Sequence, residues 1–167
     1  MQKTRETFDA APIRTSVQTV PSDWIDYNGH MNVAYYTLAI DRSLDEIFDM
    51  LGLGEELTRN HRMGPMALQA QIHYLGELLE GQRFACDFQM LDADHKRIHL
   101  FVTMQHLDKG TEAATWEAIS LNVDLSTRRS APYPAECVAR VEAMKAAHAG
   151  LPRPARAGAA IGLRRTR

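Results

Sequence analysis

The chain has 167 residues, of which 45% are hydrophobic and 24% are charged, and its formal net charge is −2. These totals are typical of one soluble globular domain with its own core, and they give no reason to expect nucleic acid or a membrane surface as a partner. No apolar run approaches the ~20 residues of a membrane span, and the polar N-terminus lacks the apolar core of a signal peptide. Two cysteines, Cys86 and Cys137, are too few for a disulfide framework. We therefore expect a cytoplasmic protein.

The first third of the chain predicts one strand followed by one long helix. Residues 13–20 alternate in polarity and predict a strand that Pro21 ends. Apolar residues then recur at three- and four-residue steps over residues 33–51, which predicts an amphipathic helix roughly 28 Å long. Asn32 is the expected N-cap and Gly52 begins the stop signal. The next residues, 52–65, predict a turn-rich connection.

The rest of the chain predicts four more strands and a second helix. Period-two patterns cover residues 66–74, 83–90, 97–105 and 113–125, and short turns join them as antiparallel neighbours require. The first of these strands is expected to present the following residues on one face: Met66, Leu68, Ala70, Ile72 and Tyr74. A helix is predicted over residues 135–148.

A single sheet with one apolar face must be covered, and the long helix is the only element able to cover it. We therefore expect an α+β domain over residues 12–150, in which a curved five-stranded antiparallel sheet wraps around the long helix and a C-terminal helix follows. The last residues, 151–167, are rich in Pro, Ala, Gly and Arg and predict an extended or disordered tail.

The segment before the long helix places a carboxylate close to a helix N-terminus. Asp26 precedes Val33 by seven residues, and Gly29 lies between them. The free N–H groups of a helix start can polarise a carbonyl oxygen, and a nearby carboxylate can attack it or activate water. Ester or thioester hydrolysis needs both. Spacing alone leaves open that Asp26 is only a turn or capping residue.

The order of elements, together with Asp26-Tyr27-Asn28-Gly29-His30-Met31-Asn32 at the helix start, resembles the hotdog-fold acyl-CoA thioesterases of the 4-hydroxybenzoyl-CoA thioesterase family. The resemblance covers residues 13–130. Segments 73–78, 94–99, 114–117 and 122–129 are similar to the betainyl-CoA thioesterases of carnitine breakdown. In that subgroup His is common where this chain has Asn122, a departure that bears on the substrate.

The resemblance implies hydrolysis of a short polar acyl-CoA, with betainyl-CoA as the first candidate, to the free acid and CoA. It implies neither a metal nor another cofactor. Asp26 matches the catalytic carboxylate, acting as nucleophile or general base, and the backbone N–H of Val33 matches the group that polarises the thioester carbonyl. Gly29 supplies backbone freedom, Asn32 is the expected cap and His30 is expected to orient the loop.

Members of this fold usually pair two sheets edge to edge, so the resemblance also implies a homodimer or a dimer of dimers with active sites at the interface. Basic residues at strand ends are candidates for binding the CoA phosphates, the alternative being a solvated charged turn. These residues are Lys96, Arg97, Arg128 and Arg129. A betainyl group carries a quaternary ammonium, which binds over aromatic faces. The aromatic candidates for an acyl pocket, each of which is otherwise a core residue, are Trp24, Tyr27, Tyr35, Tyr74 and Trp116.

Other chemistries have less support. His95 and His99 beside Asp92 or Asp94 fix no third ligand, so no metal site is predicted. Cys86 alternates with large apolar neighbours, which indicates a buried small hydrophobe, and no Gly-x-Ser-x-Gly elbow is present. Two alternatives to a thioesterase stay open on this fold. A dehydratase or hydratase would need a His paired with an acid, and a non-catalytic protein would bind acyl-CoA without turning it over.

Overall fold

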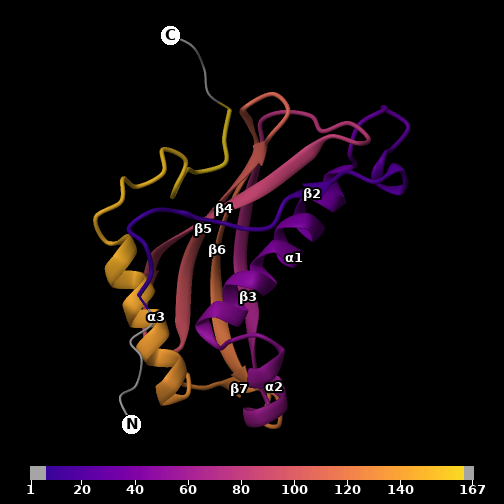
Figure 1. Cartoon of the computed structure of the whole chain (residues 1–167). Coiled ribbons are helices and arrows are strands. Elements are labelled where there is room, and N and C mark those ends of the chain that lie inside the picture. The colour runs from indigo at the N-terminus through magenta and orange to yellow at the C-terminus, as the bar shows by residue number, and fades with distance from the viewer. Residues whose placement is uncertain (1–6, 164–167) are drawn as a thin grey trace.

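The computed structural model describes residues 7–163, in which an antiparallel sheet packs against one long helix (Figure 1). The strands are β1 (Ile13–Arg14), β2 (Gln18–Thr19), β3 (Met63–Tyr74), β4 (Arg83–Ala93), β5 (Arg97–His106), β6 (Thr111–Asp124) and β7 (Arg129–Ser130). The helices are a 3₁₀ turn (Ser22–Trp24), α1 (Val33–Leu51), α2 (Glu55–His61) and α3 (Ala135–His148). In space the strand order is β1–β4–β5–β6–β3, with β2 also paired to β4 and β7 to β6. The end of the sheet opposite β1 is therefore β3.

The helix α1 forms where the apolar periodicity predicts it. The side-chain oxygen of Asn32 accepts a hydrogen bond from Ala34 N at 3.0 Å, and Gly52 ends the helix with a φ of 72°. The buried face of α1 joins inward-pointing residues of β4, β5 and β6, such as Phe88 and Leu100, in one core. The predicted bounds and cap of this helix are confirmed.

The predicted first strand is wrong in detail, because residues 13–20 form two short strands rather than one. Between them, Ser16 turns toward α1 and donates its backbone N–H to the carboxylate of Glu46 at 3.0 Å. The pairing with β4 also slips by one residue across this break, since Ile13 faces Phe88 whereas Gln18 faces Phe84, so an extra residue interrupts the ladder. Since β7 also pairs with β6, the sheet has seven strands instead of five.

The predicted turn-rich connection is also wrong, since residues 52–65 contain the short helix α2 and the start of β3. Acidic Glu55 and Glu56 lie in the first turn of α2, and Arg59 and His61 lie in its last turn, which complements the helix dipole. Leu57 is its buried anchor. One apolar residue in seven gave too little periodicity for the helix to be recognised.

A bulge at Leu68 corrects the predicted face of β3. Ala67 is paired with Ser120 and Gln69 with Ile119, so Leu68 is the extra residue. The bulge moves Met66 to the outer side of the sheet, while Ile72 keeps the inner side opposite Trp116. The strict alternation assumed from the sequence therefore holds only after the bulge.

The segment after α3 crosses the outer face of the sheet, and we call its described part, residues 151–163, the C-terminal strap. One row of paired residues runs across four strands on that face: Gln89, Phe101, Glu117 and Gln71. Three of them form hydrogen bonds with the strap. The side chains of Gln89 and Gln71 donate to Pro152 O (3.2 Å) and Ala159 O (2.7 Å), and the Glu117 carboxylate accepts from Gly158 N (2.6 Å). Phe101, the fourth, is only 3% exposed. Residues 164–167 of the predicted tail lie outside the described residues.

Candidate active site

The loop that precedes α1 is a tight turn closed by backbone hydrogen bonds. Asp26 N donates to His30 O at 3.1 Å, and Gly29 N donates to Asp26 O at 2.9 Å. Gly29 has a φ of 82°, a left-handed conformation that side-chain-bearing residues rarely adopt. A bridge between Ile25 and Met31 closes the turn at its base. The turn thus places Asp26 beside Asn32, the residue just before the helix.

Both oxygens of the Asp26 carboxylate are oriented by neighbours. Oδ1 accepts from the backbone N–H of Asn28 at 2.8 Å, and Oδ2 accepts from the side-chain amide of Asn32 at 3.1 Å. Because Asn32 Oδ1 already accepts from Ala34 N, its amide nitrogen must be the atom that faces Asp26. Asn32 therefore links the carboxylate to the first turn of α1, a role beyond the cap that the sequence predicted.

The first helical residue is Val33, at the N-terminus of α1. Within residues 7–163, no group accepts a hydrogen bond from its backbone N–H. The next two N–H groups are used, since Ala34 N donates to the Asn32 side chain and Tyr35 N to Asn32 O. One donor at the positive end of the helix dipole is thus left for a ligand.

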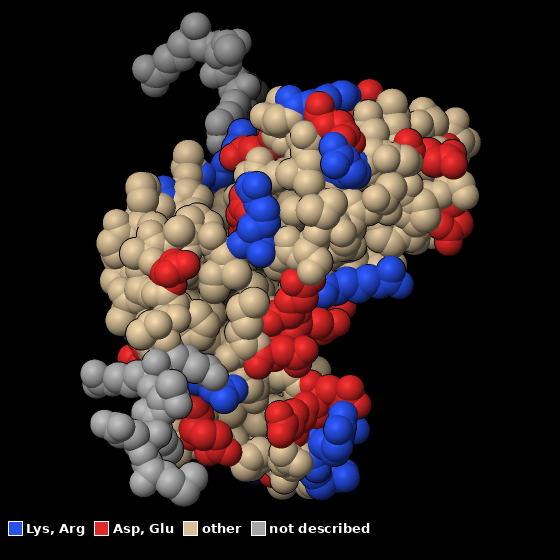
Figure 2. Space-filling view, viewed as in Figure 1, with Lys and Arg blue, Asp and Glu red and all other residues tan. Residues whose placement is uncertain are grey.

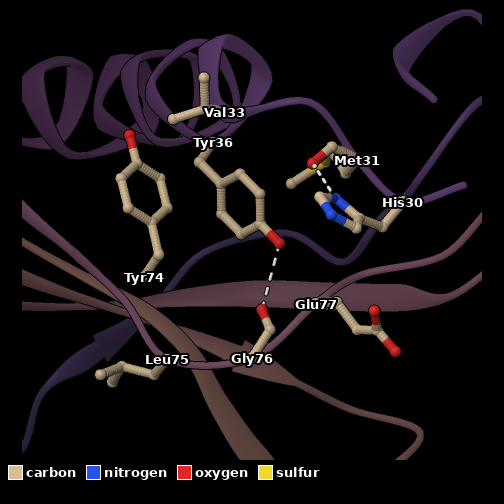
Figure 3. A pocket seen from close by; sticks show the side chains of 8 residues that line it. All are labelled: His30, Met31, Val33, Tyr36, Tyr74, Leu75, Gly76 and Glu77. Carbon is tan, nitrogen blue, oxygen red and sulfur yellow. Dashed lines mark hydrogen bonds between the residues drawn. The ribbon is translucent and has the colours of Figure 1, made fainter. Parts of the chain in front are cut away.

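A cavity of about 350 Å³ adjoins this helix start (Figure 3). Its lining residues are His30, Met31, Val33, Tyr36, Tyr74, Leu75, Gly76 and Glu77. They come from two places, the first turn of α1 with its preceding loop, and the end of β3 with the residues that follow. The cavity has the size of a small ligand site. Asp26 and Asn32 are not among the lining residues, but Asp26 is bonded to Asn32, which directly precedes the lining residue Val33.

Two tyrosines and one histidine shape the cavity. The rings of Tyr36 and Tyr74 meet edge to face, with centroids 5.4 Å apart. The Tyr36 hydroxyl donates to Gly76 O at 3.1 Å and accepts from Leu78 N at 3.2 Å, which fixes that ring in place (Figure 3). Burial raises the pKa of both phenols, so they stay neutral. His30 Nδ1 lies 3.1 Å from Met31 O, which can only accept, so Nδ1 carries a proton.

The structure does not bring the five predicted aromatic residues together. Only Tyr74 lines the cavity. Trp24 and Tyr35 stack on each other at 5.1 Å, Tyr27 is 97% exposed, and Trp116 lies in the core on β6. Tyr36 was not among the predicted residues, although its three-residue spacing from Val33 on the same helix face made it detectable.

The four basic residues predicted to bind CoA lie at the opposite end of the sheet. Arg97 is paired with Leu121 and Arg129 with Asp124, near the end of β6, whereas Tyr74 is paired with Ala114 near its start. Lys96 Nζ reaches Ser130 Oγ at 3.3 Å, so these residues form one group. A strand of 12 residues such as β3 is roughly 36 Å long. Within one chain this group is therefore remote from the cavity.

Charge at that end of the sheet is partly paired. Arg97 binds Asp94 through Nε at 2.8 Å. Burial acts to raise the pKa of Asp94, but hydrogen bonds from Arg97 and from two backbone N–H groups lower it to about 2. On the face shown in Figure 2, Lys and Arg lie among Asp and Glu and form no continuous basic patch.

Residues 7–163 contain no group of three or more potential metal ligands and no helix long and apolar enough to cross a membrane. His99 is paired with Glu117 at 2.7 Å, beneath the C-terminal strap. Cys86 is buried, and burial raises the pKa of its thiol to about 11, so it is protonated at neutral pH.

An antiparallel sheet wrapped around one long helix, with a carboxylate hydrogen-bonded to the residue that caps that helix, is the arrangement of a hotdog-fold thioester hydrolase. Residues 20–141 match the family model described as "Thioesterase-like superfamily", and the chain belongs to that family. The resemblance that its residues suggested is thereby confirmed, as is the hotdog fold.

Two sequence relatives extend over most of this chain. It is 34% identical to the betainyl-CoA thioesterase of Pseudomonas aeruginosa, over 90% of this chain and 96% of the relative. It is 32% identical to the L-carnitine dehydrogenase/betainyl-CoA thioesterase of Rhizobium meliloti, over 96% of this chain but only 32% of that longer protein.

Two solved structures are also close in shape. A Staphylococcus aureus protein in complex with CoA superposes with a TM-score of 0.84 and 28% identity, over 92% of this chain and 98% of that one. A putative thioesterase from Pseudomonas putida gives a TM-score of 0.79 and 30% identity over the same shares of each chain.

Proposed function

We propose that this protein hydrolyses a short, polar acyl-CoA to the free acid and CoA, and that betainyl-CoA is its substrate. One observation carries the proposal: the Asp26 carboxylate is held by Asn32 beside a helix start whose first N–H, on Val33, has no acceptor within residues 7–163. The choice of the betainyl group rests on two relatives whose names include betainyl-CoA thioesterase. They also support a role in carnitine breakdown.

In the proposed reaction the thioester carbonyl oxygen accepts a hydrogen bond from Val33 N–H, which stabilises negative charge as it develops. Asp26 then attacks the carbonyl carbon or removes a proton from the attacking water, and the C–S bond breaks to release the CoA thiolate. In the first route water hydrolyses the resulting anhydride and restores the carboxylate. Both routes need the same carboxylate and the same backbone donor, and neither needs a cofactor. Gly29 permits the turn, and His30 lines the cavity beside it.

The proposed site is completed by a second copy of the chain. At the free end of the sheet, residues 66–74 of β3 carry no Asp, Glu, Lys, Arg or Pro, and Met66 and Leu68 are 41% and 58% exposed. An exposed edge strand without charges or proline is a template for pairing with another strand, and β3 has neither beyond its bulge at Leu68. In an antiparallel pair of two β3 edges, the start of one strand lies beside the end of the other. The partner's group of basic residues, including Lys96 and Arg128, would then lie near this chain's cavity and could bind CoA phosphates.

The test is release of free CoA thiol from betainyl-, acetyl-, butyryl-, decanoyl- and benzoyl-CoA by the wild type and by Asp26→Asn. We expect betainyl-CoA to have the highest kcat/KM, and the substitution to lower it by about 10²-fold or more. A thermal melt of the variant controls for folding. Binding of CoA without turnover of any thioester would instead identify a non-catalytic acyl-CoA-binding protein.

A further inference from the structure

The cavity beside the helix start has an acidic and aromatic lining. Glu77 is the only carboxylate among its eight lining residues, and none of them is Lys or Arg. Within residues 7–163 no ion pair or hydrogen bond involves the Glu77 side chain, which is exposed next to the cavity. The negative charge of Glu77 is felt inside the cavity, at Tyr36. Burial is the main cause of the raised pKa of Tyr36, and the charge of Glu77 raises it further. A positively charged group in the cavity would therefore be attracted.

The aromatic part of the lining is also suited to a cation. Tyr74 is 47% exposed, whereas Tyr36 is only 4% exposed, is held by two hydrogen bonds and supports Tyr74 edge to face. In Figure 3 these two rings stand side by side between the first turn of α1 and the segment that carries Gly76 and Glu77. An accessible neutral ring binds alkylammonium groups over its face. In Figure 3 Glu77 lies on the other side of Tyr36 from Tyr74, so the ring and the carboxylate border the same cavity from two sides.

The other aromatic pair near the helix start is already occupied. Trp24 stacks on Tyr35, and the guanidinium carbon of Arg42 lies 5.8 Å from the centre of the Trp24 ring. A second cation placed there would be repelled by Arg42. Of these two aromatic clusters, the one beside the helix start and β3 thus has an exposed ring, Tyr74, in a cavity that Glu77 also lines, whereas the other carries a cation.

Resting on the proposed thioesterase function, we propose that Glu77 and the Tyr74 ring, supported by Tyr36, select acyl groups that carry a positive charge near the thioester. Glu77 is then a specificity residue that acts on the acyl group of the substrate, distinct from the catalytic carboxylate Asp26. The small volume of the cavity, about 350 Å³, favours a compact quaternary ammonium over a long alkyl chain.

The experiment compares two thioesters of nearly equal shape. Betainyl-CoA carries a trimethylammonium group, and 3,3-dimethylbutyryl-CoA carries a neutral tert-butyl group in the same place. The readout is the ratio of their kcat/KM values for the wild type, Glu77→Gln, Tyr74→Leu and the control Glu80→Gln. Glu80 is an exposed glutamate three residues further along the same loop and does not line the cavity.

We expect Glu77→Gln to lower the betainyl-to-neutral ratio about fivefold or more, because one attractive charge is lost. Tyr74→Leu should lower it as well, and Glu80→Gln should leave it within about twofold. An unchanged ratio in Glu77→Gln, or equal losses for both thioesters, would overturn the assignment while leaving the thioesterase in place. Absence of turnover of both thioesters by the wild type would overturn the proposed function itself and the assignment with it.

Discussion

The side chain of Asn32 connects two functions that are usually separate. Its oxygen caps α1 through Ala34 N, and its nitrogen donates to the Asp26 carboxylate. Removing the side chain would disturb both the helix and the carboxylate, so a simple deletion could not tell them apart. A substitution that keeps the cap and changes only the contact with Asp26 separates the two.

Asn32→Asp is such a substitution, since Asp is about as good an N-cap as Asn. We expect the thermal midpoint to stay within a few degrees, because the cap is kept. The second carboxylate would repel Asp26, because two like charges side by side disfavour the doubly ionised pair. The acidic limb of the kcat/KM profile should therefore move to higher pH, and the rate at neutral pH should fall by about tenfold or more.

Asn32→Ser is the matched control for this prediction. Serine also caps helices but brings no charge near Asp26. Its acidic limb should stay close to that of the wild type even if its rate is lower. An equal pH shift in both variants would show that the shift does not arise from charge repulsion.

At the scale of elements, β3 and the C-terminal strap give the sheet two different surfaces. The outer face is covered by the strap, which bonds three of the four residues in one row across the strands. The β3 edge carries a bulge at Leu68 but no charge between residues 66 and 74. Altering the covered face should therefore change stability, whereas altering the free edge should change pairing between chains.

Leu68→Lys places a charge on the free edge, where its long side chain stays solvated in a single chain. We expect the wild type to sediment as the proposed dimer and this variant to sediment as a monomer at micromolar concentration, since charged edges resist pairing. Activity should fall with the dimer, because the basic residues of the partner would no longer lie near the cavity. Met50→Lys, at a residue of α1 that is 42% exposed, is the control and should leave the mass unchanged.

Ending the chain at Gly150 removes the strap and uncovers Phe101. We expect the free energy of unfolding to fall by about 1–3 kcal/mol, from the lost hydrogen bonds and the exposed ring. For a domain of this size that corresponds to a fall in Tm of roughly 2–12 °C. A chain that ends at Leu163 keeps every described strap contact and should melt like the full-length protein. Equal melting of both shortened chains would show that the strap does not stabilise the sheet.

At the scale of the whole molecule, two buried histidines make stability depend on pH. Burial lowers the pKa of His106, which bonds Gln82 through Nε2, and that of His148, which accepts a hydrogen bond from Met90 N at 2.9 Å. Both rings are 2% exposed. The neutral ring is the form that each site accommodates.

The unfolded chain, with an ordinary histidine pKa near 6.5, therefore takes up protons before the folded chain does. The free energy of unfolding should be constant above about pH 7.5 and fall as the pH drops from about 6.5 to 5. Chemical denaturation at several pH values measures this slope. His148→Gln should be less stable at pH 8 yet show a shallower slope, whereas the exposed His95→Gln should keep the slope of the wild type. A slope that is identical in His148→Gln would contradict the assignment of that histidine.

Local patterns in the sequence determined most of the elements and the turn that carries Asp26. The cap at Asn32, the apolar periodicity of α1, the stop at Gly52 and the alternation in β4 to β6 each depend on residues close together in the chain, so their structure follows from short-range sterics and hydrogen bonding. The turn from Asp26 to His30 is local for the same reason. The resemblance of this segment to known thioesterases accordingly rests on residues that are neighbours in the chain.

Contacts between distant residues were decided only by the tertiary structure. Ser16, at the break in the first strand, bonds Glu46, thirty residues away, and the strap bonds Gln71, Gln89 and Glu117 on three strands. Glu77 became a cavity residue because the end of β3 returns beside the start of α1. The separation of Lys96 and Arg128 from that cavity follows from strand direction in the same way. Such arrangements are set by how the sheet closes around the helix, and no spacing along the chain encodes them on its own.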